Sequence, residues 1–275
     1  MTFAPRSLLF VPGDRPDRFE KALASAADAI CIYLEDTVAP ESKAQARDQT
    51  LAFLKASPSR GRIVVRLNPM GTAAGLADLA ALVAGDVAAA ALMLPKSESA
   101  DVLAMIGSVF ADAGRAQPLI PLVETALALR TAASLASAPQ VTGLALGPVD
   151  LAAQMGAVLD EASSLHIRMQ IQLAASEAGV MSWDGPSLVI DDPERLAAQT
   201  QTVVQLGYTG KLCIHPGQAK PVNDCFTPSP DAVVAAERVL AAAEQAGGGV
   251  FRLGGKMIDA PVLASARKVL ARAGR

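Results

Sequence analysis

Short apolar runs that alternate with longer helical stretches are the feature of this sequence that most constrains its fold. Eight such runs carry apolar residues at consecutive positions instead of alternating ones. That pattern is typical of strands buried on both faces, as in parallel sheets covered by helices. The runs are Ser7–Val11, Ala29–Glu35, Arg62–Leu67, Ala90–Leu94, Leu119–Val123, Gly143–Leu146, Ser187–Ile190 and Lys211–Ile214.

The segments between these runs are rich in alanine and leucine and have helical periodicity. Strand–helix alternation repeated eight times without a long linker favours a closed (β/α)₈ barrel, the TIM-barrel architecture, over an open doubly wound sheet. The 275 residues suit one such barrel. The predicted helices are Pro16–Ala26, Glu41–Ala56, Ala74–Ala84, Ser99–Ala113, Ala126–Ala136, Glu161–Ala178 and Pro193–Leu206.

The chain continues beyond the length that barrel closure needs. We assign residues 1–225 to the barrel and residues 226–275 to a C-terminal helical extension. In the extension, helical segments at Pro230–Ala246 and Ala260–Ala273 flank the glycine-rich stretch Gly247–Gly255. The extension either caps its own barrel or crosses to a neighbouring subunit.

Composition excludes several classes of protein. The net charge is −3, and no basic block interleaved with aromatic residues marks a nucleic-acid-binding surface. No apolar stretch has the roughly 20 residues of a membrane-spanning helix, and the first apolar run is too short for a signal peptide. We therefore expect a cytoplasmic protein. Cys31 and Cys213 lie in apolar runs without a CxxC motif and are interpreted as small buried hydrophobic residues. We place all three cysteines, Cys225 included, outside the chemistry.

Polar residues recur where the apolar runs end. The carboxyl ends of the strands in this type of barrel gather at one mouth, where the chemistry takes place. One charged residue there can simply mark the chain leaving the core, but recurrence at nearly every strand predicts an active site. The residues are Pro12-Gly13-Asp14, Glu35-Asp36, Arg66 and Asn68, Pro95-Lys96, Glu124, Pro148 and Asp150, Asp191-Asp192, and His215-Pro216.

Glu124 and Asp150 follow neighbouring predicted strands, so their carboxylates can meet above the barrel. Two carboxylates without a histidine or thiolate suit a hard divalent ion, Mg²⁺ or alternatively Mn²⁺, with water and substrate oxygens completing an octahedron. The alternative is that each residue caps the helix that follows.

Arg66 would place a fixed cation near that ion. Its guanidinium group suits a substrate carboxylate or a developing enolate oxygen, and it can equally form a structural pair with Glu35 or Asp36. His215 is open to two interpretations, as an acid–base group or as a hydrogen-bonded wall residue.

At these residues the sequence resembles the citrate lyase β-subunit-like family, within the HpcH/HpaI-type aldolases and alongside malyl-CoA and citramalyl-CoA lyases. The resemblance covers nearly the whole chain in order, and its motifs are specific when taken together. They are Arg6-Ser-Leu-Leu-Phe-Val-Pro-Gly13, Leu34-Glu-Asp-Thr-Val38, Val65-Arg-Leu-Asn68, Met93-Leu-Pro-Lys-Ser-Glu98, Val123-Glu-Thr125, Gly147-Pro-Val-Asp-Leu151, Gly210-Lys-Leu-Cys-Ile-His-Pro216 and Gly255-Lys-Met-Ile-Asp-Ala-Pro261.

The resemblance implies a role for several residues. It assigns Mg²⁺ to Glu124 and Asp150, and it assigns contact with the oxoacid or the enolate to Arg66. Glu35 and Asp36 would support the waters of the metal. The resemblance further implies that Asp259, delivered from a neighbouring protomer of a homotrimer, is the acid–base group at the methyl carbon of acetyl-CoA. Substrate contacts are expected at Phe10 and Asp36, and contacts with the CoA tail at Arg18 and Lys21, with Arg15 nearby.

The implied reaction is a retro-aldol or Claisen cleavage of a 3-hydroxyacyl thioester that bears a carboxylate, such as malyl-, citramalyl- or citryl-CoA. An acyl-carrier protein could present the same thioester, because it shares the pantetheine arm. One alternative is a metal-dependent aldolase or decarboxylase on a free oxoacid; such aldolases use an early histidine base, which His166 and His215 do not supply. Another is a carrier-protein-dependent subunit of a citrate lyase complex.

The sequence departs from the family pattern around the seventh strand. Gly185-Pro186-Ser187-Leu188 replaces a segment in which a tyrosine or histidine is expected, and His166 and Arg168 stand where the sixth helix begins in relatives. These positions shape the substrate pocket in the family, so the identity of the substrate is left open.

Overall fold

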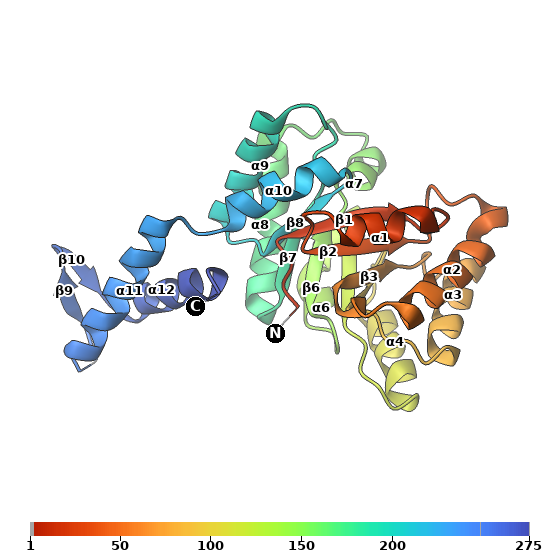
Figure 1. The fold of residues 1–275 in the computed structure, drawn as a ribbon, viewed down its shortest axis with the longest axis horizontal. Helices are drawn as coiled ribbons and strands as arrows, with labels where there is room; N and C mark the ends of the chain where they lie inside the picture. The colour runs from red at the N-terminus through yellow and green to blue at the C-terminus, as the bar shows by residue number, and fades with distance from the viewer. Residues whose placement is uncertain (1–2, 248, 275) are drawn as a thin grey trace. The chain divides into compact units, whose positions relative to one another are not determined.

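Eight parallel strands close into a barrel in the computed structural model, which describes residues 3–247 and 249–274 (Figure 1). Each strand pairs with the next, and β8 pairs with β1, as the sequence predicted. The strands are β1 (Ser7–Pro12), β2 (Ala29–Tyr33), β3 (Ile63–Arg66), β4 (Ala91–Leu94), β5 (Leu119–Val123), β6 (Gly143–Leu146), β7 (Met181–Asp184) and β8 (Gly210–Cys213).

The strands are apolar at consecutive positions because both of their faces are buried. In β3, Val64 belongs to the cluster that fills the barrel, while Ile63 and Val65 are buried on the helix side. Burying one such side chain contributes about 1.5–3 kcal/mol. Cys31 belongs to the same inner cluster, and burial raises the pKa of its thiol to about 12. Cys213 is equally buried, which confirms that both thiols are apolar core groups.

Helices cover the outer face of the barrel, and side-chain caps begin several of them. Thr72, Ser99, Thr125, Asp160 and Asp192 accept hydrogen bonds from backbone N–H groups in the first turn of the following helix. The helices from the first to α10 are α1 (Phe19–Leu23), α2 (Lys43–Ala56), α3 (Ala73–Ala84), α4 (Ala100–Asp112), α5 (Ala126–Arg130), α6 (Ala132–Ala136), α7 (Pro148–Met155), α8 (Glu161–Ala178), α9 (Pro193–Leu206) and α10 (Pro216–Phe226), with 3₁₀ turns η1 (Pro16–Arg18), η2 (Pro40–Ser42) and η3 (Arg60–Arg62).

The predicted seventh strand, Ser187–Ile190, is wrong. The strand is β7, Met181–Asp184, and Leu188, Val189 and Ile190 are exposed. The sequence misleads here because Asp184 looks unsuited to a buried strand, yet it is fully buried and paired with Lys211. The short helices α7 and α10 were not predicted, and the predicted helix Ala126–Ala136 is divided into α5 and α6 at Thr131.

The chain divides into two compact units, Met1–Asn223 and Asp224–Arg275. In the second unit, α11 (Pro230–Gln245) packs against α12 (Ala260–Arg272), and β9 (Phe251–Leu253) pairs antiparallel with β10 (Lys256–Ile258). Gly254 and Gly255 form the turn between these strands at positive φ, which glycine adopts without strain. Gly248, in the predicted glycine-rich stretch, lies outside the described residues. Among the helices described, none is long and apolar enough to cross a bilayer.

Trp183 lies in the barrel interior and leaves little space for its neighbours. Its indole Nε1–H donates to the carbonyl of Pro5 at 2.9 Å, and a Cβ at Gly143 would lie 2.4 Å from the indole ring. Glycine is therefore required at position 143 so that the ring can lie against β6.

We expect Gly143→Ala to destabilise the protein by about 1–3 kcal/mol, because the added methyl group must displace Trp183 or the backbone. Urea unfolding followed by tryptophan fluorescence measures this cost. Gly61→Ala is the matched control, since a Cβ there meets nothing within 4 Å. Equal stabilities for the two variants would contradict the close packing of Trp183.

Candidate active site

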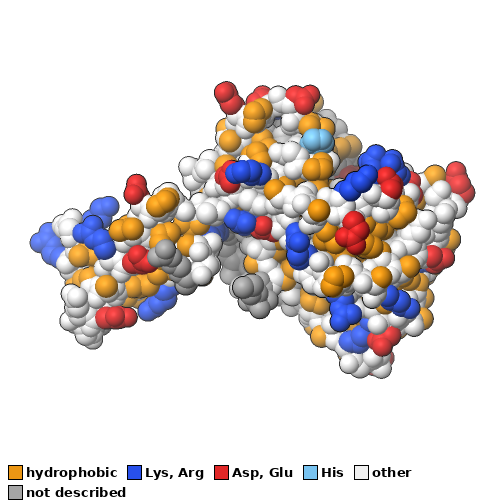
Figure 2. All heavy atoms as spheres, in the orientation of Figure 1, with side chains coloured by type: hydrophobic (Ala, Val, Ile, Leu, Met, Phe, Trp, Pro, Cys, Tyr) orange, Lys and Arg blue, Asp and Glu red, His pale blue; other side chains and the backbone are white. Residues whose placement is uncertain are grey.

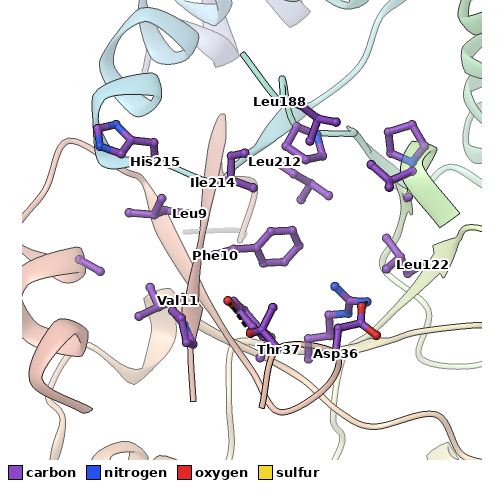
Figure 3. Close-up of a pocket in the computed structure, with 18 of the residues that line it drawn as sticks. Leu9, Phe10, Val11, Asp36, Thr37, Leu122, Leu188, Leu212, Ile214 and His215 are labelled. Carbon is purple, nitrogen blue, oxygen red and sulfur yellow. Dashed lines mark hydrogen bonds and ion pairs between the residues drawn. The ribbon is translucent and has the colours of Figure 1, made fainter. Parts of the chain in front are cut away.

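A cavity of about 730 Å³ lies at the carboxyl ends of the barrel strands. Both charged and apolar side chains line it. Asp36 is one of the charged residues, and Leu122 and Ile214 are among the apolar ones (Figure 3). Seven of the expected site residues line this cavity: Phe10, Arg18, Lys21, Asp36, Arg66, Glu124 and Asp150. Glu35 does not line it and reaches the site through its hydrogen bond with Arg66. The structure thus brings together residues from six of the eight motifs, because Ile214 and His215 also line the cavity.

Glu124 follows β5 and is buried at the floor of this cavity. Its Oε1 accepts a hydrogen bond from the backbone N–H of Lys96 at 2.8 Å, and its Oε2 lies 3.8 Å from Nη2 of Arg66. A Cβ at Gly147 would lie 2.5 Å from Cβ of Glu124, so glycine there leaves room for the carboxylate against the end of β6. Burial, opposed by Arg66, raises the pKa of Glu124 to about 7.

Asp150 stands in the first turn of α7, half-buried, close enough for its charge to help raise the pKa of Glu124. Neither carboxylate is a helix cap, because Thr125 caps α5 and Gly147 holds the cap position of α7. Two converging carboxylates, one of them buried in a space that only glycine leaves open, fit a hard divalent cation. No cluster of three or more potential metal-ligating side chains occurs among the described residues, so water and substrate oxygens would supply the remaining ligands.

Arg66 ends β3 and connects the acidic residues of the cavity. Its Nη2 donates to Glu35 in a short hydrogen bond and to Oδ2 of Asp36 at 3.1 Å. The guanidinium group also lies 5.8 Å from the centroid of the Phe10 ring, within cation–π range. Both structural pairs expected for Arg66 are therefore present. The Nε–H of Arg66 is buried and has no hydrogen-bond partner among the described residues, so one donor remains for a ligand.

Lys96 has a larger part in this site than its position after β4 suggested. Its Nζ lies 3.5 Å from Oε1 of Glu35, whose pKa is raised by burial. Its backbone has a φ of 48°, an unusual conformation for a residue with a side chain, and this conformation accompanies the hydrogen bond to Glu124. The motif Met93-Leu-Pro-Lys-Ser-Glu98 was the signal, but it could not reveal a role for a backbone N–H.

Residues 6–216 match the model of the HpcH/HpaI aldolase/citrate lyase family. The chain belongs to this family. A citrate lyase subunit beta-like protein of Mycobacterium tuberculosis is 37% identical over 273 residues, which cover 97% of this chain and 94% of that protein. A (3S)-malyl-CoA thioesterase of Cereibacter sphaeroides is 34% identical over 274 residues, covering 98% and 94% of the two chains.

A solved structure of the family shares the whole architecture. The crystal structure of CitE from Mycobacterium tuberculosis in complex with magnesium, acetoacetate and coenzyme A is similar with a TM-score of 0.84 and 36% identity, and the match covers 100% of both chains. The closed eight-stranded barrel and the helical C-terminal unit are therefore those of this HpcH/HpaI family.

The basic residues expected to meet the CoA tail divide into two groups. Arg18 and Lys21 line the cavity from η1 and α1, where basic side chains gather on the face drawn in Figure 2. Arg15 instead forms an exposed pair with Asp17 at 2.9 Å and does not line the cavity. Arg18 and Lys21 are thus the better placed of the three for a ligand in the cavity.

The histidines of this family member lie at or beyond the edge of the cavity. His215 is an exposed rim residue, and its Nδ1 accepts a hydrogen bond from the backbone N–H of Gly217 at 3.1 Å. His166 contacts Gln170 on the exposed side of α8 and does not line the cavity. Arg168 is buried behind the cavity, paired with Asp184, and does not line it either.

Asp259 belongs to the C-terminal unit, where it is the N-cap of α12. Its Oδ1 accepts a hydrogen bond from the backbone N–H of Val262 at 3.2 Å, and the residue is half-buried. The side chain therefore has a structural role within its own unit. A catalytic role for Asp259 stays a prediction.

Arg66→Ala should leave the buried carboxylates uncompensated and cost about 3–5 kcal/mol of stability at pH 8. The folded pKa of Glu124, about 7, lies above its ordinary value of 4.5, so its favourable contribution is present at low pH and is lost as pH rises through 7. Arg66 opposes this rise, so its removal should raise the pKa of Glu124 further. The cost of Arg66→Ala should therefore grow as pH rises above 7, where Glu124 ionises in the parent protein but stays protonated in the variant.

Chemical denaturation of both proteins in EDTA across this pH range measures the effect. Arg15→Ala, which removes an exposed pair, should show no such growth with pH. A cost for Arg66→Ala that is independent of pH would contradict the compensating role of the guanidinium group.

Proposed function

We propose that this chain is a Mg²⁺-dependent carbon–carbon lyase that acts on a 3-hydroxyacyl thioester bearing a carboxylate, of the malyl-, citramalyl- or citryl-thioester class. The observation that carries the proposal is one cavity in which Glu124 and Asp150 converge beside the buried cation Arg66. Its volume of about 730 Å³ is within the usual range for small-molecule sites. The names of its relatives, and the magnesium and coenzyme A in the CitE complex, support the same chemistry.

Glu124 and Asp150 would hold the metal ion. When bound, Mg²⁺ supplies Lewis-acid stabilisation to the hydroxyl oxygen that becomes a carbonyl on cleavage. Burial and the backbone N–H of Lys96 fix the carboxylate of Glu124 in one orientation, while half-buried Asp150 approaches from the first turn of α7. Mn²⁺ prefers similar oxygen ligands and is expected to substitute.

Arg66 would stabilise negative charge on the thioester enolate or hold the oxoacid carboxylate. Glu35 and Asp36 restrict its side chain, so the cation is oriented before substrate binds and needs no reorganisation during the reaction. Phe10 would pack against the substrate beside this group. Arg18 and Lys21 would bind the phosphates of coenzyme A, or the phosphopantetheine of an acyl-carrier protein.

Asp259 of a neighbouring copy would transfer the proton at the methyl carbon of the acetyl group. On cleavage it would protonate the acetyl enolate, and on condensation it would remove the same proton. This assignment requires a homo-oligomer, for which a trimer is the family expectation. We place the reaction in the cytoplasm, where coenzyme A thioesters would be its partners.

The first test is a condensation reaction. Purified protein is incubated with acetyl-CoA or propionyl-CoA and with glyoxylate or pyruvate, in Mg²⁺ or in EDTA, and acyl-CoA products are followed by mass spectrometry. We expect a 3-hydroxyacyl-CoA product in Mg²⁺, its loss in EDTA, and its loss in Glu124→Gln. Turnover of free oxaloacetate with no thioester product would identify a free-oxoacid aldolase or decarboxylase instead.

Two further outcomes of this assay separate closely related functions. Product formed only with an acyl-carrier-protein thioester would identify a carrier-dependent subunit. Release of free coenzyme A from a malyl thioester would show that hydrolysis follows, the activity for which the Cereibacter sphaeroides relative is named.

Asp259→Asn should lower the rate by about 10²–10⁴-fold while leaving thermal stability near that of the parent protein. Asparagine caps a helix as well as aspartate does but cannot exchange the proton, so this change separates catalysis from capping. Asp160→Asn, the same change at the N-cap of α8, is the matched control and should retain activity.

Mixed oligomers test whether Asp259 acts from a neighbour. Asp259→Asn and Glu124→Gln chains, each inactive alone, should recover activity when co-expressed, because some sites then combine two intact residues from different chains. Absence of recovery in an assembled mixture would place Asp259 in the same chain as Glu124 or outside the chemistry.

A further inference from the structure

A second cavity of about 690 Å³ lies beside the active-site cavity. It is bordered by α7, by the start of α8, by α9 and by the segment between β7 and α9. The two cavities share part of their lining, so these shared residues form a wall between them. The wall residues are Leu146, Pro148, Val149, Pro186 and Leu188.

The segment that follows β7 alternates between buried residues and more exposed residues that line both cavities. Gly185 and Ser187 are buried, whereas Pro186 is half-buried and Leu188 is 63% exposed, and the latter two line both cavities. A Cβ at Gly185 would lie 2.4 Å from Cδ of Pro148, so the two halves of the wall are in close contact. This packing leaves no room for a larger residue at position 185.

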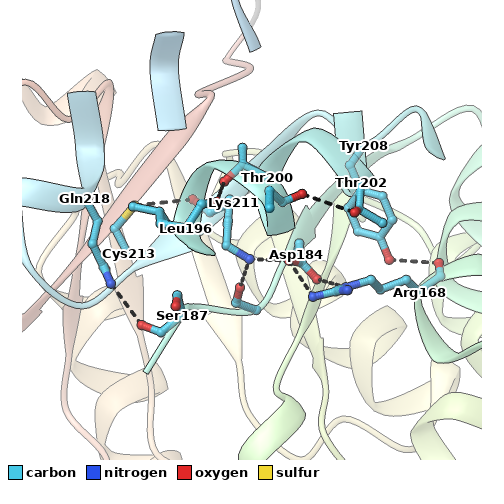
Figure 4. A network of polar contacts seen from close by, with 12 residues as sticks. Arg168, Asp184, Ser187, Leu196, Thr200, Thr202, Tyr208, Lys211, Cys213 and Gln218 are labelled. Carbon is cyan, nitrogen blue, oxygen red and sulfur yellow. Dashed lines mark hydrogen bonds and ion pairs between the residues drawn. The ribbon is translucent and has the colours of Figure 1, made fainter. Parts of the chain in front are cut away.

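Two buried side chains hold the carbonyl groups of the two buried residues, Gly185 and Ser187 (Figure 4). Nζ of Lys211 donates to the carbonyl of Gly185 at 2.7 Å, and Nε2 of Gln218 donates to the carbonyl of Ser187 at 2.9 Å. Oε1 of Gln218 accepts from the backbone N–H of Ile214 at 2.9 Å, which ties the segment to the end of β8. An irregular segment is thereby held at both of its buried carbonyls.

A buried ion network fixes Lys211 itself. Its ammonium group contacts Asp184, whose Oδ1 accepts from Nε of Arg168 at 2.9 Å. Nη1 of Arg168 donates to Glu161 at 2.7 Å, and the hydroxyl of Tyr208 donates to the backbone carbonyl of Arg168 at 2.8 Å. Removing such ions from water costs several kcal/mol per ion, so the network is weak evidence for added stability. Its contacts do fix the position of the Lys211 ammonium group beneath the segment.

The wall faces the apolar side of the active-site cavity. In Figure 3, Leu188 lies on the side opposite Asp36 and Thr37, with the ring of Phe10 between them. The cavity therefore has a charged side at Arg66 and Asp36 and an apolar side at Leu188, so a ligand whose polar end binds Arg66 would direct an apolar substituent towards Leu188.

We propose that Lys211 and Gln218 are positioning residues that hold Gly185–Leu188 as a rigid wall, and that Leu188 sets the largest apolar substituent the substrate can carry. The substrate class is a hydroxyacyl thioester whose hydroxyl-bearing carbon has hydrogen or a short alkyl group. The substrate assignment rests on the proposed function, whereas the anchoring of the wall does not.

The size limit is tested with a series of 2-oxoacids of increasing chain length, from glyoxylate to 2-oxopentanoate, condensed with acetyl-CoA in Mg²⁺. Leu188→Ala opens the wall towards the second cavity, so the ratio of kcat/KM for 2-oxopentanoate to that for glyoxylate should rise at least about tenfold. An unchanged ratio in an active, folded variant would overturn the role of Leu188.

Anchoring is tested with Gln218→Glu, which keeps the acceptor for Ile214 but replaces the donor to Ser187 by a carboxylate oxygen. Hydrogen exchange of the amides between 185 and 190 should become at least about tenfold faster, and selectivity for chain length should weaken. Gln172→Glu is the matched control, because Gln172 binds Ser182 and Gly207 at the other end of β7 and does not touch the wall.

The two measurements separate the failure of each idea. Wild-type protein that condenses no oxoacid with any thioester contradicts the proposed function, while the exchange experiment still decides whether Gln218 anchors the wall. Faster exchange in Gln172→Glu equal to that in Gln218→Glu, or no change in either, would overturn the anchoring.

Discussion

The concentration of buried negative charge beneath the cavity mouth is the constraint on which the rest of the candidate site depends. Glu35 and Glu124 are almost fully buried, and Arg66 lies within ion-pair distance of both. Because each buried ion loses several kcal/mol of solvation, these groups hold their geometry only as a set. Two local features accommodate the carboxylate of Glu124 in this set of buried ions. The positive backbone φ of Lys96 accompanies its hydrogen bond to Glu124, and the glycine at position 147 leaves space for the side chain.

Adjacent residues of the last two strands have side chains on opposite faces of the barrel wall. Trp183 and Leu212 fill the barrel, while the adjacent Asp184 and Lys211 point outward into the ion network beneath α8 and α9. This alternation follows from the two-residue period of a strand. It allows one pair of strands to complete the core and, through the carbonyl of Gly185, to support the wall of the cavity.

The sequence predicted the barrel because seven of its strands are continuous apolar runs, and it predicted the gathering of Glu124, Asp150 and Arg66 because parallel strands end at one mouth. It failed at β7 because the partners that make Asp184 tolerable in a buried strand are distant in sequence. A hydrogen bond from a backbone group, such as the N–H of Lys96, does not depend on residue type. The sequence therefore could not predict it.

The hydrogen bond between Trp183 and the carbonyl of Pro5 has a kinetic meaning beyond packing. It joins the N-terminal segment to the side chains that fill the barrel, so the space beneath Glu124 is solid core. A ligand at Glu124 therefore has no route through the barrel and must leave by the mouth through which it arrived. In the proposed cleavage, both products would therefore have to leave through this one opening, past Arg18 and Lys21.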